Sequence, residues 1–212
     1  MTITTRERKA SSLFGPDQQP QTFYASTQLS LPGINLGERT VEVVPTGHPG
    51  PGDLVGQDIL QEWCCEYSLS QGQLVLHDTS LEDGIPITVT PSGHVIVGVT
   101  WPDQTTARAL FDTGASLTVI NQGFAADHPS LFSSRGNIGG VDADGKTAEM
   151  AMVTVTSCTL LGSSFPASLA VVADLNGIQL GDDAFDMIVG WPIIKHGTFT
   201  IDHRRRLGRH HP

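Results

Sequence analysis

The sequence has few charged residues, few cysteines and no long apolar stretch, and each shortage excludes a class of protein. Charged residues make up 16% of the 212 positions and the net charge is −10, which argues against a general nucleic-acid binder. No run of about 18 apolar residues occurs, so neither a transmembrane helix nor a membrane partner is expected. Three cysteines, two of them adjacent, make a poor disulfide framework. Because no apolar segment follows the charged N-terminus, we expect no secretory signal and a reduced, cytoplasmic protein.

Several motifs of known chemistry are also missing. None of the eight histidines has H-E-x-x-H spacing, and the adjacent pair Cys64-Cys65 lacks the gap of a C-x-x-C zinc motif. We therefore expect no metal site and no cofactor. The absence of G-x-S-x-G disfavours a serine hydrolase. The loop at residues 46–53, TGHPGPGD, has no lysine and is not expected to bind phosphate.

Turn-forming residues are abundant, since 23 glycines and 13 prolines separate many short apolar runs. This composition favours an all-β protein. We expect strands at residues 22–44, 86–111, 150–174 and 198–202, and a hairpin about Gln71-Gly72. Short helices are expected after Gly56, before His128-Pro129 and after Gly190, because proline disfavours helix in the residue before it and suits a first helical turn.

The most informative stretch is ALFDTGASLTVI, residues 109–120. An apolar run leads straight into Asp112, and the apolar pattern resumes at Leu117. An ionised aspartate is rarely buried unless another group pairs with it or shares its proton. Gly114 allows the backbone to fold closely around the carboxylate, and Thr113 has a side chain suited to local hydrogen bonds. The pattern predicts a strand that delivers a carboxylate to a tight loop.

A second pattern is a candidate internal repeat. LVGQDILQEWCCEYSLS from Leu54 aligns without gaps to IVGWPIIKHGTFTID from Ile188, so that Val55-Gly56 meets Val189-Gly190. The match is short and apolar, and both a true repeat and a coincidence remain open at this point.

Three stretches together resemble the retropepsin-like group of aspartic proteases: ALFDTGAS at 109–116, the Gly-rich hairpin at 137–146, and MIVGWPII at 187–194. The resemblance implies an all-β acid-protease barrel with a short C-terminal helix. It implies an aspartic endopeptidase that acts on a peptide or protein substrate without a cofactor. The chain has only one D-T-G, so the resemblance further implies a homodimer in which each subunit supplies Asp112.

The same resemblance assigns roles to individual residues. Asp112 is the catalytic residue. Its active-site loop is supported by Thr113, Gly114, Ala115 and Ser116. The expected flap, which would close over the substrate, includes Gly139, Gly140, Val141, Asp142 and Gly145. Structural roles fall to Ile188, Val189 and Gly190.

The resemblance covers about residues 85–203 and divides the chain. We expect a disordered arm at 1–22, a partial and degenerate related lobe without a D-T-G loop at 23–84, the retropepsin-like lobe at 85–203 and a solvated basic tail at 204–212. Three origins of the front half stay open: a two-lobed, pepsin-like form that lost the start of its first lobe, a sequence that starts too late, and an unrelated flanking domain. The alternative function is a non-catalytic, protease-like β module for dimerisation or peptide binding.

Overall fold

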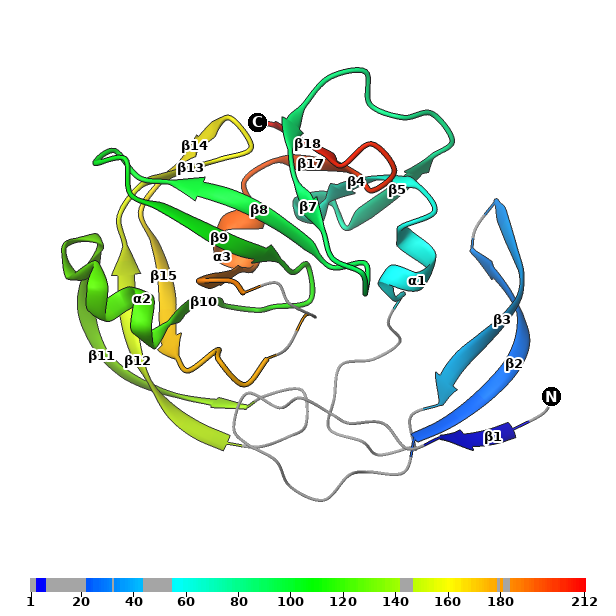
Figure 1. Cartoon of the computed structure of the whole chain (residues 1–212), viewed down its shortest axis with the longest axis horizontal. Coiled ribbons are helices and arrows are strands. Elements are labelled where there is room, and N and C mark those ends of the chain that lie inside the picture. Colours follow the sequence, from blue (N-terminus) through cyan, green and yellow to red (C-terminus); the bar gives the residue numbers. More distant parts are fainter. Residues whose placement is uncertain are drawn as a thin grey trace.

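The computed structural model describes residues 3–6, 22–31, 33–43, 55–141, 147–178, 180 and 184–212 (Figure 1). These residues form mainly strands with three short α-helices, so the predicted all-β class is confirmed. The helices are α1 (Gln57–Leu60), α2 (Gln122–Asp127) and α3 (Trp191–Ile194), and two 3-10 turns cover Leu69–Gln71 and Pro129–Leu131. None of these helices is long and apolar enough to cross a membrane.

The largest sheet contains ten strands, in the order β11-β12-β15-β10-β16-β9-β8-β13-β14, with β7 paired to β8. Its strands are β7 (Thr88–Val89), β8 (Val95–Thr100), β9 (Thr106–Phe111), β10 (Thr118–Asn121), β11 (Phe132–Val141), β12 (Thr147–Val155), β13 (Cys158–Leu160), β14 (Ser163–Phe165), β15 (Ser168–Ala173) and β16 (Met187–Val189). The pairs β9·β16 and β10·β15 are parallel, and the others are antiparallel.

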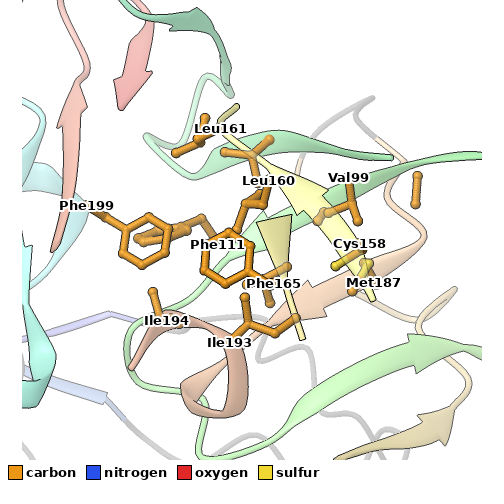
Figure 2. Packing of buried hydrophobic residues seen from close by; sticks show 14 of the residues in the cluster. Val99, Phe111, Cys158, Leu160, Leu161, Phe165, Met187, Ile193, Ile194 and Phe199 are labelled. Atoms are coloured by element: carbon orange, nitrogen blue, oxygen red, sulfur yellow. The ribbon is translucent and has the colours of Figure 1, made fainter. Parts of the chain in front are cut away.

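The central strands are buried on both faces. In β9, Phe111 packs in the larger apolar cluster and Leu110 in the smaller one, and β16 divides its side chains in the same way. A strand that is covered on both faces has no polar side, which explains the continuous apolar runs before Asp112 and Gly190. In Figure 2, Phe111, Phe165 and Phe199 lie together above Ile193 and Ile194 of α3. The Phe111 and Phe199 ring centroids are 5.4 Å apart.

A second sheet joins the front of the chain to its end. Its order is β5-β4-β17-β18-β6, from β4 (Cys64–Ser68), β5 (Gln73–His77), β6 (Ile85–Pro86), β17 (Thr198–Asp202) and β18 (Leu207–His211). The β4–β5 hairpin confirms the turn predicted about Gly72, whose φ is +63°. This sheet crosses the domain boundary predicted at residue 84, and the division into domains stays a prediction.

The end of the chain differs from the solvated tail that its composition suggested. Leu207–His211 forms β18, which pairs with β17. The His210 ring lies 4.6 Å from that of Phe199, so it covers the aromatic cluster. Arg204 and Arg205 are exposed in the turn, and Arg209 forms an ion pair with Asp83. Two of the arginines therefore lie in the turn and the third is paired with a carboxylate, so the charge does not prevent the strand from pairing.

The front of the chain forms a separate three-stranded sheet of β1 (Ile3–Arg6), β2 (Thr22–Leu31) and β3 (Ile34–Val43), on one side of the molecule (Figure 1). The two-strand hairpin confirms the strands expected over residues 22–44. Arg39 forms a two-point ion pair with Glu62, in which both N–O distances are 2.9 Å. Of the expected disordered arm at 1–22, residues 3–6 form β1 and residue 22 begins β2, while residues 1–2 and 7–21 lie outside the described part.

Asp202 at the end of β17 is fully buried and joins the second sheet to the segment before β6. Its carboxylate accepts hydrogen bonds from the backbone N–H groups of Leu81, at 2.8 Å, and Arg205, at 3.0 Å. Burial by itself would raise the pKa of Asp202. The two backbone bonds, a bond to Ser80 and the charge of Arg204 outweigh it, so the pKa lies below its usual value.

This shift predicts a pH-dependent contribution to stability. A carboxyl group with a lowered folded-state pKa stabilises the protein above its unfolded value of about 3.9, and the stabilisation is lost as the pH falls through the folded-state pKa. We expect Asp202→Asn to lower the free energy of unfolding by about 2 kcal/mol at pH 7, the scale of a hydrogen bond to a charged group. Urea unfolding at pH 7 and at pH 3 would measure the difference, which should shrink at the lower pH. An equal loss at both pH values would contradict the assignment.

Candidate active site

The Asp112 loop connects β9 to β10 and is held by backbone hydrogen bonds. The N–H of Asp112 donates to the carbonyl of Val189, at 3.1 Å, and so continues the β9·β16 ladder by one residue. Asp112 Oδ1 accepts from the N–H of Gly114, at 2.8 Å. The N–H of Ala115 donates to the Asp112 carbonyl, at 3.3 Å. The loop is therefore a tight turn that wraps around a half-buried carboxylate.

Gly190 holds the other side of this loop. A Cβ atom at this position would overlap the backbone carbonyl oxygen of Leu117 and lie 2.7 Å from that of Ala115. The N–H of Trp191 donates to the Ala115 carbonyl, at 2.8 Å. The φ of Gly190 is −115°, a value open to any residue, so the close approach of the loop is what requires glycine here.

Thr118 is a site residue that the sequence reasoning did not select. Its side chain is fully buried, and its hydroxyl oxygen accepts a hydrogen bond from the Gly190 N–H, at 3.3 Å. The bond links the start of β10 to the turn before α3. The available signal was a threonine within the apolar run LTVI, because a hydroxyl buried among apolar side chains needs a partner.

The predicted loop residues have distinct surroundings. Thr113, Gly114 and Ser116 are exposed, and Ala115 is half-buried. Gly114 and Ala115 contact Asp112 through their N–H groups. Ile188 and Val189 are buried in β16 beside Leu110 and Phe111, and they bring the Gly190 turn to the loop.

The predicted flap is the hairpin of β11 and β12. Gly139 and Gly140 pair with Glu149 and Ala148, and Val141 pairs with Thr147. Asp142 and Gly145 lie outside the described residues. Ile138, next to Gly139, is 37% exposed. Over the described residues, no hydrogen bond joins this hairpin to the Asp112 loop.

Within the described part of the chain, no hydrogen bond links Asp112 to a second carboxylate. No group of three or more His, Cys, Asp and Glu side chains there is arranged to hold a metal ion. A surface hollow lined by Trp101, Pro102 and Cys158, among others, includes no residue of the Asp112 loop. The chemistry available at this site is that of one half-buried carboxylate held by backbone hydrogen bonds.

Comparison with known proteins shows what the segment around this site is similar to. Residues 97–193 match the family model of aspartyl proteases. A retropepsin-like aspartic protease from Rickettsia conorii is 17% identical, and the match covers 57% of this chain and 87% of that one with a TM-score of 0.37. The retroviral protease-like domain of Ddi1 from Leishmania major is 18% identical, with coverage of 55% and 90% and a TM-score of 0.30. No curated protein matches the chain.

The matched segment begins in β8, contains the whole Asp112 loop and ends in α3, so it includes both stretches that meet at Gly190. Residues 97–193, which include the Asp112 loop, therefore match the aspartyl protease family.

Proposed function

We propose that this chain is an aspartic-type endopeptidase in which Asp112 is a catalytic residue that acts on water. The observation that carries the proposal is the position of its carboxylate. It follows a strand buried on both faces, is held by the Gly114 N–H at 2.8 Å, and lies in a loop whose neighbouring residues are exposed. A carboxylate in such a loop is both accessible and held in place.

The proposed reaction needs a second carboxylate. One ionised carboxylate takes a proton from the attacking water, and a protonated one donates a hydrogen bond to the peptide carbonyl oxygen. Two carboxylates at hydrogen-bond distance cannot both ionise, so they share one proton, an arrangement for which aspartic proteases are the general example. In the resulting tetrahedral intermediate the carbon–nitrogen bond breaks as the amine takes up a proton.

The sequence predicts that the second carboxylate comes from Asp112 of another copy in a homodimer. A symmetric dimer would place the two loops on its two-fold axis. An extended peptide would bind as an added strand beneath the β11–β12 hairpin, which would act as a flap. Both the homodimer and the flap remain proposals.

A non-catalytic β module is the second candidate. The observation that favours it is the absence, among the described residues, of a carboxylate joined to Asp112. In this case the chain would bind peptides or partners through its strands without cleaving them.

The assay that separates the two candidates is cleavage of an unfolded protein substrate across a range of pH. An aspartic-type enzyme is expected to cut internal peptide bonds with a bell-shaped, acidic pH profile, since one carboxyl must be protonated and one ionised. A chelator should leave the rate unchanged. Binding of the substrate without cleavage at any pH would support the non-catalytic module.

A further inference from the structure

Two parts of the chain have the same order of helix and strands. The first unit contains α1, β4 and β5, and the second contains α3, β17 and β18. The elements have equal lengths and equal spacing: Gln57–Leu60 corresponds to Trp191–Ile194, Cys64–Ser68 to Thr198–Asp202, and Gln73–His77 to Leu207–His211. One constant offset of 134 residues (191 − 57) relates every boundary.

The hydrogen bonds at the start of each unit also correspond. The carbonyl of Gly56 accepts from the N–H groups of the third and fourth residues after it, at 3.1 and 3.2 Å. The carbonyl of Gly190 does the same at 3.1 Å for both. In the turn between the two strands, Gly72 has φ +63° and its counterpart Arg206 has φ +56°. Because one of these positions is not glycine, the shared left-handed turn reflects the common geometry of the units rather than a shared residue type.

The two units are related by a local two-fold axis. Strand β4 pairs with β17 antiparallel, with Glu66 opposite Thr200, and these two residues are also each other's counterparts. On either side, Cys65 pairs with Ile201 and Tyr67 pairs with Phe199. Cys65 corresponds to Phe199 and Ile201 corresponds to Tyr67, so exchanging the units converts the Cys65–Ile201 pair into the Phe199–Tyr67 pair. This is the contact rule of a symmetric dimer, in which residue i meets j and j meets i.

The axis also relates the Asp112 loop to a corresponding position in the first unit. The second unit begins at Gly190, which packs against the backbone of the Asp112 loop. The first unit begins at Gly56. The rotation that places the second unit on the first would therefore move the Asp112 loop to a position beside Gly56. Over the described residues, a Cβ atom at Gly56 would meet only the Asp58 side chain. Val55 is 40% exposed, although its counterpart Val189 is fully buried.

We propose that residues 56–77 act as an internal substitute for a second subunit, so that a homodimer pairing two Asp112 loops about this axis does not form. Strand β17 lies between β4 and β18, so both of its edges are already hydrogen-bonded (Figure 1). A second copy could reach β17 only by displacing β4. This arrangement replaces the homodimer predicted from the sequence, so the second carboxylate of the proposed reaction would have to come from a group other than a second Asp112. The role of Asp112 rests on the proposed function. The occupation of the β17 edge by β4 does not.

Cysteine cross-linking at the axis tests the proposal. In a homodimer built on β17, Thr200 would face Thr200 of the other copy, so Thr200→Cys alone would yield a covalent dimer on oxidation. If β4 is the partner, this variant stays monomeric, and the double variant Glu66→Cys, Thr200→Cys forms a link within one chain. Non-reducing electrophoresis and peptide mapping distinguish the two. The wild-type chain, whose three cysteines are buried and unpaired, is the control.

The expected result is an intrachain link in the double variant and no covalent dimer in the single variant. A covalent dimer in the single variant would overturn the proposal. Sedimentation of the wild-type chain, which needs no substitution at the buried Thr200, should give a monomer, and a dimer in which Thr200→Cys forms a cross-link between the copies would overturn the proposal. An inactive protein with the expected link would remove the proposed function but leave this inference standing.

Discussion

Replacement of Asp112 by asparagine is expected to abolish peptide cleavage while the protein stays folded. Asparagine keeps an oxygen that accepts the Gly114 N–H, now bonded to Asp112 Oδ1 at 2.8 Å, so the turn is preserved. It has no carboxylate to take a proton from water. Loss of a general acid or base lowers rates by about 10²–10⁴-fold, so the variant should cleave at least about 100-fold more slowly than the wild-type protein. The free energy of unfolding should change by about 1 kcal/mol or less.

The measurement is the cleavage rate at the acidic optimum, together with urea unfolding of both proteins. Asp127→Asn is the matched control, because Asp127 is an exposed aspartate at the end of α2, away from the loop. It should leave the rate and the stability unchanged. Unchanged cleavage in the Asp112 variant would rule out the proposed mechanism, and unfolding of that variant would show that the carboxylate serves the fold instead.

Replacement of Gly190 by alanine is expected to cause a large loss of both stability and activity. The added Cβ would overlap the Leu117 carbonyl oxygen and lie 2.7 Å from that of Ala115. These are backbone atoms of the active-site loop, so relief requires the loop to move. Overpacking of this kind costs about 1–3 kcal/mol, and we expect a value at the upper end, about 3 kcal/mol. The same displacement would move Asp112, so cleavage should fall as well.

Gly56→Ala is the control for this prediction, since Gly56 is the counterpart of Gly190 in the first unit. The Cβ would meet only the carboxylate end of Asp58, a side chain that can rotate away. The expected loss is about 1 kcal/mol or less. Thermal and urea unfolding of the two variants measure the contrast. Equal losses at the two positions would show that the contact with the loop is not what requires glycine at 190.

The sequence alone indicated the elements that rest on local chemistry. The α2 helix ends before His128-Pro129, as expected, because proline disfavours helix in the preceding residue. A short helix follows Gly190, with Pro192 in its first turn, and its location was predicted on the same kind of argument. The alignment of Leu54 with Ile188 pointed to a repeat, because equal runs of apolar residues and glycine leave a trace in the sequence.

Local sequence patterns did not predict the pairings between residues that are distant in the sequence. The basic composition of residues 207–211 predicts a solvated tail, but these residues form β18, whose partner strands are determined by register and burial. The pairing of β4 with β17 could not be predicted for the same reason, since residues 64–68 and 198–202 meet only after folding. Thr118 escaped notice because its bond to Gly190 joins positions 72 residues apart.

The sequence by itself determined the all-β class, the strand that ends at Asp112 and the glycine that precedes the final helix. These features depend on apolar runs, turn residues and proline, all of which act over a few residues. Only the tertiary structure decided that Gly190 packs against the Asp112 loop and that residues 56–77 face residues 190–211 across a two-fold axis. Those relations depend on strand register and close packing between distant segments, which no short stretch of sequence specifies.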